Sequence, residues 1–467
     1  FGVAVIGMSI LGLTETLHNF GGTTYIVQVK QLTPERLQAV FTITFALTAT
    51  LAALLLLAAQ PIASFYDAPG LKAFLQITAL CIMLGPFVTP LYAVMRRNLE
   101  FGKMAVLNGA SVVVNTTATI TLALLGFSYM SFALGSLIGG VVYLLLCWWL
   151  GPKEQIYRFT FADWREISAY GAYDSLTNLL NYARHALPML AFGKTLGADG
   201  LGFYQRALSI SMLPEKTMLA GLTPVLLPAL SRHIREGREL KVALFYSIEY
   251  VTALFWPAML VVAILANPIV EILLGHQWAQ AVPIVQIIAT AFLLQLPSSI
   301  PSSVQIAAGA IRDCFIVALI TVPMAIGVQA FASTYGLEMA AASLFLVCPL
   351  SGLVAIVMVR WRVPFEWSEL WTILWRSGIV ALFTALGPAA VAVYCGGTRE
   401  VSIAAGIVGF VTAPIGWLIG LRVAGHPMLR EVNLVRSVML TLLSEQIPAG
   451  LQRRVSGLAR VRIRKRP

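Results

Sequence analysis

Charged residues are scarce in this sequence, and their scarcity excludes a soluble protein. Asp, Glu, Lys and Arg make up 11% of the 467 residues and apolar residues 58%, whereas soluble domains are about 25% charged. Uncharged, mainly apolar runs such as 41–59 and 104–150 are long enough to cross a bilayer as helices. They are continuously apolar and do not alternate, which also excludes a transmembrane β-barrel. The sequence therefore predicts an all-α polytopic membrane protein.

Reactive motifs are also missing. The five cysteines form no Cys-x-x-Cys pair and lie within or at the ends of apolar runs, so we expect free, packed thiols and no disulfide or metal site. The chain has no His-Glu-x-x-His sequence, Gly-rich phosphate loop or serine nucleophile elbow. A membrane glycosyltransferase would carry acids in a sizeable outer loop, and the longest outer connections hold only Asp67 and Glu271. We therefore expect neither an enzyme nor a bound cofactor.

Apolar windows of about 20 residues mark the expected membrane spans. Thirteen ranges qualify: 3–22, 39–59, 71–94, 104–126, 129–150, 167–193, 201–230, 243–266, 281–304, 314–332, 337–359, 376–395 and 401–421. Their alternate connections carry nearly all Lys and Arg residues, and the other set holds only Lys72, Lys194 and Arg399. The positive-inside rule makes the basic set and the C-terminus cytoplasmic. Since Phe1 then starts outside without a signal peptide, we expect one earlier helix.

Two short strings occur twice along the chain. Ala59-Gln-Pro-Ile62 recurs as Ala266-Asn-Pro-Ile269, 207 positions later, and Gln76-Ile-Thr-Ala79 as Gln286-Ile-Ile-Ala289, 210 positions later. Their shared order and spacing favour a duplication over chance recurrence in apolar sequence. Six spans separate the copies, so the predicted fold has two six-helix lobes related by a pseudo-twofold axis along the membrane normal, plus a terminal helix pair. The expected parts are an N-terminal lobe at 1–150, a C-terminal lobe at 151–365, the pair at 366–423 and a tail at 424–467.

A series of motifs runs through residues 200–313. In order, they are Leu201-Gly-Phe-Tyr-Gln-Arg-Ala207, Pro224-Val-Leu-Leu-Pro-Ala-Leu-Ser-Arg232, Ala266-Asn-Pro-Ile-Val270, Leu274-Gly-His-Gln-Trp278 and Ala308-Gly-Ala-Ile-Arg312. None is diagnostic alone, but with the repeat and the topology they resemble the Wzx-type polysaccharide flippases of the multidrug/oligosaccharidyl-lipid/polysaccharide (MOP) exporter superfamily. That family has fourteen spans, which agrees with a first helix before Phe1.

The resemblance implies a function in the bacterial inner membrane. The protein would move an undecaprenyl-diphosphate-linked oligosaccharide across the bilayer by alternating access, for exopolysaccharide or O-antigen synthesis. Alternatives are a peptidoglycan-precursor lipid flippase, a cation-coupled drug exporter, or a non-transporting scaffold of a polysaccharide assembly complex. We expect a monomer that binds no nucleic acid, and contact with a polysaccharide polymerase or another assembly protein stays open.

Ionisable side chains at membrane depth are functional candidates, because each costs several kcal/mol there. The guanidinium groups of Arg184 and Arg206 suit a diphosphate, which they bind bidentately, and Lys216 adds a point charge. Four neighbouring polar side chains are candidates for lining a sugar cavity: Asn178, Asn181, Gln205 and Ser211. Four acids are candidates for ion coupling: Glu15, Asp174, Glu215 and Glu249. The alternative is that these cations and acids only balance one another.

The tail from residue 424 differs from the rest of the chain. It holds nine basic and two acidic residues, and Leu429, Val432, Val435 and Met439 fall near one helical face. This pattern predicts an amphipathic helix at the membrane surface, followed by a polybasic end that binds anionic lipids.

Overall fold

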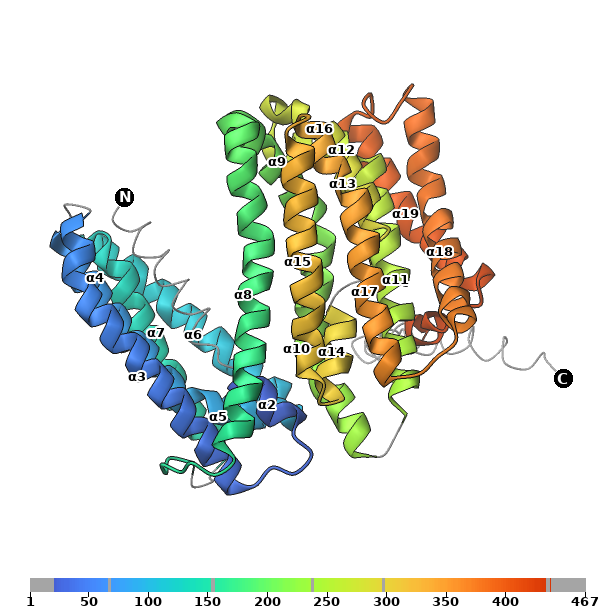
Figure 1. The fold of residues 1–467 in the computed structure, drawn as a ribbon. Helices are drawn as coiled ribbons and strands as arrows, with labels where there is room; N and C mark the ends of the chain where they lie inside the picture. Colours follow the sequence, from blue (N-terminus) through green and yellow to red (C-terminus); the bar gives the residue numbers. More distant parts are fainter. Residues whose placement is uncertain are drawn as a thin grey trace, which may run out of the picture. The chain divides into compact units, whose positions relative to one another are not determined.

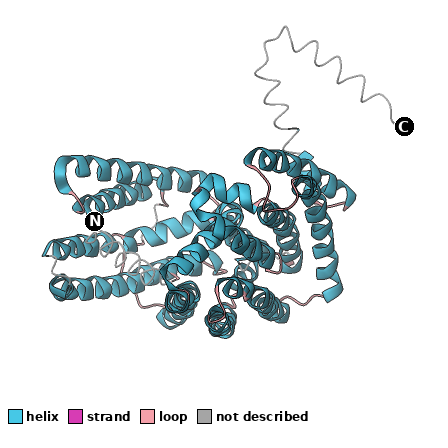
Figure 2. Cartoon of the chain, turned by 90° about the horizontal axis from the view of Figure 1, so that it is seen from above, coloured by secondary structure: helices cyan, strands magenta, loops and turns pink. Residues whose placement is uncertain are grey.

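The computed structural model describes residues 21–65, 69–152, 156–236, 239–295, 299–433 and 437, and all regular secondary structure in these ranges is helical (Figures 1 and 2). The predicted all-α class is confirmed. The candidate Glu15, all but the last two residues of the expected first span at 3–22, and nearly all of the tail beyond residue 433 lie outside the described residues.

Nine helical segments within the described ranges are long and apolar enough to cross a membrane. They comprise α3 (Pro34–Phe65), α4 (Pro69–Met83) with α5 (Gly85–Arg97), α6 (Phe101–Leu122) with η1 (Ala123–Phe127), α7 (Met130–Leu150), α11 (Leu240–Ile264), α15 (Ile311–Ser333), α16 (Leu337–Ala342) with α17 (Leu344–Arg362), α18 (Trp367–Tyr394) and α19 (Ile403–Val423). Each coincides with a span expected from the sequence, and the protein is therefore a multi-pass membrane protein.

Three other expected spans have a less regular form. The range 167–193 lies in α8 (Trp164–Thr195), a single long helix with many polar residues. The range 201–230 is divided between α9 (Gly197–Ser211) and α10 (Leu213–Arg235), and the break at Met212 comes just before a proline, which cannot donate a helical hydrogen bond. The range 281–304 contains α13 (Val282–Phe292) and α14 (Ser299–Ala307). The total number of spans stays a prediction.

The order of the helices repeats along the chain. The starts of α3 and α11 lie 206 residues apart, those of α6 and α15 210, those of α7 and α16 207, and those of α8 and α18 203. These offsets match the spacing of the repeated strings, and the repeated residues Ala59 and Ala266 are both fully buried. In this correspondence α8 pairs with α18. The expected boundary at residue 150 and the extent of the lobes stay predictions.

The helices form two compact units. The first comprises residues 1–248 and 294–366, and the second comprises residues 249–293 and 367–467. The second unit includes α12 (Ala266–Leu274), η2 (His276–Ala281), α13, α18 and α19.

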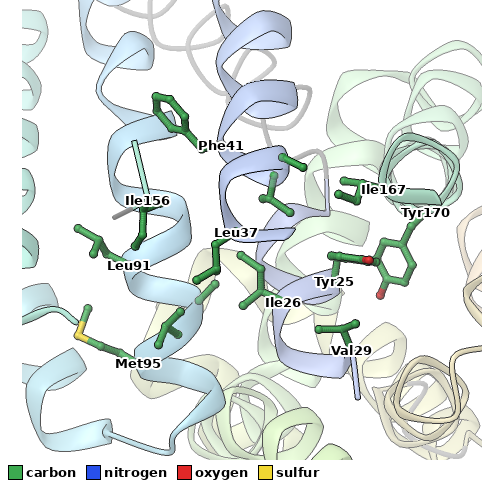
Figure 3. Close-up of a cluster of buried hydrophobic side chains, with 14 of the residues drawn as sticks. Tyr25, Ile26, Val29, Leu37, Phe41, Leu91, Met95, Ile156, Ile167 and Tyr170 are labelled. Carbon is green, nitrogen blue, oxygen red and sulfur yellow. The ribbon is translucent and has the colours of Figure 1, made fainter. Parts of the chain in front are cut away.

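A buried apolar cluster in the first unit holds the short helix α2 (Gly22–Gln28) against α3, α5 and α8 (Figure 3). Tyr25 and Ile26 of α2 are almost completely buried, and the Tyr25 ring meets Tyr170 of α8 edge-on at a centroid distance of 5.4 Å. Leu37 and Leu91 join the cluster from α3 and α5. Close packing of these side chains fixes the position of α2, and α2 forms part of the site described next.

Candidate functional site

A polar cavity of about 610 Å³ lies within the first unit, between α2, α3, α5 and α8. Eleven of its thirteen lining residues have polar side chains and the other two are glycines. They are Gly21, Gly22, Thr23, Thr24, Thr44, Thr89, Tyr92, Arg96, Asp174, Asn178, Asn181, Tyr182 and His185. Small-molecule sites have volumes of about 300 to 1,000 Å³ and are usually mostly apolar. This cavity is of that size but has a wall of hydroxyl, amide and charged groups.

One face of α8 supplies five of these residues. Asp174, Asn178, Asn181, Tyr182 and His185 are spaced by 4, 3, 1 and 3 positions, which places them on one side of a helix with 3.6 residues per turn. The amide of Asn178 donates to a carboxylate oxygen of Asp174 at 3.3 Å. These five residues form the α8 wall of the cavity.

Gly21 allows α2 to approach α8 closely. It has a left-handed φ of 68°, and a Cβ atom built at this position would lie 2.9 Å from the Cβ of Asp174. Both the backbone angle and the contact favour glycine here. Asp174 thus lies beside the start of α2, on the cavity wall.

The sequence-predicted residues Asn178, Asn181 and Asp174 all line this cavity. Their roles in sugar binding and ion coupling stay predictions. Gln205 lies on α9, is exposed and is not a cavity residue, while Ser211 is fully buried.

Sequence reasoning missed Arg96 as a cavity residue. The apolar window ends at residue 94, so the sequence places Arg96 in the connection that follows the span. In the structure α5 continues to Arg97, and Thr89, Tyr92 and Arg96 occupy one face of it, at spacings of three and four residues. That helical periodicity is the signal that would have identified Arg96.

A second charged cluster involves α8 and α10. The Arg184 guanidinium donates to the hydroxyl of Ser351 on α17 at 3.3 Å and interacts electrostatically with Glu215. Glu215 Oε2 is buried without a hydrogen-bond partner among the described residues. Lys216 interacts with His185, which also lines the cavity. The structure therefore brings three predicted residues, Arg184, Glu215 and Lys216, into one cluster, whereas Arg206 lies exposed on α9.

Glu249 belongs to the second unit and does not line the cavity. Its Oε1 lies 3.6 Å from Arg376 Nη1 and 3.9 Å from His426 Nε2. His426 is almost fully buried, and burial lowers the pKa of its imidazole to about 4, so this ring is neutral at pH 7. These contacts favour the charge-balance interpretation of Glu249, and ion coupling at this residue stays a prediction.

Two arginines hold the C-terminal end of α2, opposite the end that lines the cavity. Arg235 of α10 donates to the carbonyl of Val27 at 3.2 Å. Arg97 of α5 donates to four carbonyls: Ile26 at 2.6 Å, Val27 at 3.4 Å, Val29 at 2.6 Å and Lys30 at 3.1 Å. The last carbonyls of a helix have no partners within it and carry partial negative charge, so two guanidinium groups stabilise this end.

The fold and the cavity define a multi-pass helical membrane protein with a polar cavity. Residues 1–283 match the family described as polysaccharide biosynthesis protein. Because this match covers more than half of the chain, the protein belongs to that family.

Characterised relatives carry names from the same field. The chain is 25% identical over 299 residues to the lipopolysaccharide biosynthesis protein WzxC of Escherichia coli K12, which covers 63% of this chain and 60% of WzxC. It is 24% identical over 299 residues to the succinoglycan biosynthesis transport protein ExoT of Rhizobium meliloti, which covers 64% of this chain and 60% of ExoT. The chain thus matches about three fifths of the length of these relatives.

Solved transporters have a similar fold. A MATE transporter in a bent conformation superposes with a TM-score of 0.65 at 15% identity, over 79% of this chain and 88% of that one. The lipid II flippase MurJ in an inward closed conformation gives a TM-score of 0.58 at 16% identity, over 90% of this chain and 91% of MurJ. A related structure is described as a multidrug resistance MATE transporter of the MOP superfamily. The chain therefore shares the fold of these transporters.

Proposed function

We propose that this protein is a flippase that translocates an undecaprenyl-diphosphate-linked oligosaccharide across the bacterial inner membrane by alternating access, for exopolysaccharide or O-antigen synthesis. The observation that carries the proposal is the polar cavity inside a multi-pass helical unit. Family membership and the names of WzxC and ExoT support it. The chemistry is transport, with no covalent step.

The cavity wall suits sugars better than apolar drugs. Sugar hydroxyls both donate and accept hydrogen bonds, and threonine, asparagine and tyrosine side chains can do the same. Thr44, Thr89, Asn178 and Asn181 supply such groups from three helices. A drug exporter would gain little from a wall without aliphatic side chains, because apolar burial drives such binding. The cavity therefore favours the oligosaccharide over the drug.

The diphosphate of the proposed substrate is anionic and needs cations near the polar cavity. Arg96 lines the cavity directly. Arg184 and Lys216 belong to the neighbouring cluster on α8 and α10. We propose that Arg96, Arg184, Lys216 and Arg206 bind the diphosphate. Arg96 is thereby added to the residues predicted from the sequence. A guanidinium fork matches two phosphate oxygens at once. We propose Asp174, and Glu215 in the cluster, as the acids that couple transport to an ion.

A peptidoglycan-precursor lipid is the closest alternative substrate, because it shares the diphosphate and the lipid tail. The likeness to MurJ shows a common fold and does not select between the two. A non-transporting scaffold has no use for a polar chamber. We further propose a monomer with its C-terminus in the cytoplasm, whose basic tail binds anionic lipids and leaves room for a polymerase or another assembly protein.

Polymer export in cells tests the role of the cavity. Asn178→Leu and Asn181→Leu together remove two hydrogen-bonding side chains from the wall without changing charge. At about 0.5 to 1.5 kcal/mol per hydrogen bond, export should fall about tenfold. Asn108→Leu on α6 is the matched control, because Asn108 is exposed and outside the cavity, and it should export normally. Equal export by the double variant and the wild type, at equal protein level, would reject the cavity as the transport site.

A further inference from the structure

Hydrogen bonds join the connection between α7 and α8 to α3, α5 and the end of α7. The Tyr157 hydroxyl donates to the carbonyl of Phe87 at 2.8 Å and accepts from Trp148 Nε1 at 3.1 Å. The backbone N–H of Thr160 donates to the Thr42 hydroxyl at 3.0 Å. Residues 156–163 therefore have a defined path along α3 and α5.

This path runs alongside a membrane-spanning helix. Thr42 lies eight residues after the start of α3 at Pro34, which corresponds to about 12 Å along the helix axis. Ring contacts hold the connection at this level, because Phe159 lies 5.6 Å from Phe41 and 5.5 Å from Phe45 between ring centroids. The connection thus turns back along α3 from the end where that helix starts.

The connection and the end of α7 also expose large apolar side chains to the surroundings of the protein. Phe159 is 67% exposed and Phe161 72%, and at the end of α7 Trp148 is 63% and Trp149 78% exposed. In water these four residues would form an apolar surface of the kind that soluble proteins bury. Aromatic residues of this type concentrate where the polar head groups of a bilayer meet its hydrocarbon core.

Cations accompany these aromatic residues. Arg158 and Arg165 are exposed, and the Arg165 guanidinium lies 5.7 Å from the centroid of the Trp164 ring. Asp163 closes the connection with a left-handed φ of 52° and accepts from Arg36 Nε at 2.9 Å. These two exposed cations match the charge of anionic phospholipids.

We propose that residues 156–165 form an interfacial hook that seats in the head-group region of the cytoplasmic leaflet and binds anionic phospholipid. Phe159 and Phe161 lie among the upper acyl carbons, and Arg158 and Arg165 contact phosphates. Since the hook is bonded to α3 and α5, it fixes the depth at which the cavity-lining helices sit in the bilayer. This inference depends on the membrane placement of the chain and not on the transported substrate.

Photocrosslinking in a bilayer tests the hook. A benzophenone analogue of phenylalanine replaces Phe159 or Phe161 in the full chain, reconstituted in vesicles of phosphatidylethanolamine and phosphatidylglycerol. Mass spectrometry should find phospholipid adducts at both positions. The matched control is the same analogue at Phe192, which is fully buried and should crosslink only within the protein. Adducts with a second protein copy, or no lipid adduct at either position, would overturn the proposal.

A second measurement examines the cations and needs no photoreactive group. The thermal midpoint of the wild-type protein should rise when phosphatidylglycerol replaces part of the phosphatidylethanolamine. Arg158→Gln with Arg165→Gln should reduce this rise by about half, since the remaining basic residues still bind the same lipid. An unchanged rise would show that these arginines do not contact anionic head groups. If the double variant fails to fold, the crosslinking result alone decides.

Discussion

Replacing Arg97 with alanine should loosen α2 and with it one wall of the cavity. Arg97 serves four backbone carbonyls at the end of α2, and each buried carbonyl left without a partner costs about 1 to 3 kcal/mol. Water can reach the carbonyl of the exposed Lys30, and Arg235 still donates to that of Val27. The carbonyls of Ile26 and Val29 remain, so we expect a loss of about 3 kcal/mol. Arg235 makes one contact to α2, at 3.2 Å, and Arg235→Ala should cost about 1 kcal/mol.

The assay is thermal unfolding of the purified protein in detergent. The measured quantity is the fraction of protein that stays monodisperse after heating. Arg97→Ala should lower the midpoint by several degrees, and Arg235→Ala by less. Arg97→Lys should fall between the wild type and Arg97→Ala, because an ammonium group cannot reach four carbonyls at once. Arg232→Ala is the control for loss of a cation from α10, since Arg232 is exposed and pairs only with Glu236 among the described residues. A wild-type midpoint for Arg97→Ala would show that Arg97 does not stabilise α2.

Three further changes follow from the same contacts. Gly21→Ala should destabilise the protein by about 1 to 3 kcal/mol, because the left-handed φ and the 2.9 Å approach to Asp174 both oppose a Cβ, and an unchanged melting midpoint would contradict this. Arg184→Ala should reduce protein abundance if Glu215 is its structural partner, and adding Glu215→Gln should restore abundance and export together; if Arg184 binds the diphosphate, export should stay absent in the double variant. His426 has a folded pKa of about 4, below the usual value of 6.5, so the unfolded chain binds the proton more readily and stability should fall as the pH drops from about 6.5 to 4. His426→Gln should flatten that part of the stability curve, and an equally steep curve would show that another group titrates.

The membrane spans could be predicted from the sequence because a long apolar run leaves few structural alternatives in a bilayer. Windows of hydropathy located all nine strongly apolar segments. They could not locate the break at Met212, because an interruption of one residue hardly alters a window average. They locate the long helix α8, but they do not show which of its polar residues share a face.

Only one wall of the cavity could have been predicted from the sequence. Asn178, Asn181 and Asp174 share a helix, so their common face follows from sequence spacing. Arg96 comes from another helix, 78 residues before Asp174, and only tertiary packing shows that the two share a wall. The contacts of Arg97 and Arg235 to α2 could not be predicted either. Their acceptors are backbone carbonyls, which every residue has, and no side-chain pattern marks them.

Transport by the purified protein tests the central claim most directly. The full chain is reconstituted in vesicles with a fluorescent undecaprenyl-diphosphate oligosaccharide, and a membrane-impermeant reagent that modifies the sugar measures the fraction in the outer leaflet over time. The account predicts that the wild type and Asn108→Leu equilibrate the lipid between leaflets, and that Asn178→Leu with Asn181→Leu slows this about tenfold. Vesicles with wild-type protein that move the lipid no faster than protein-free vesicles, under any imposed ion gradient, would contradict it.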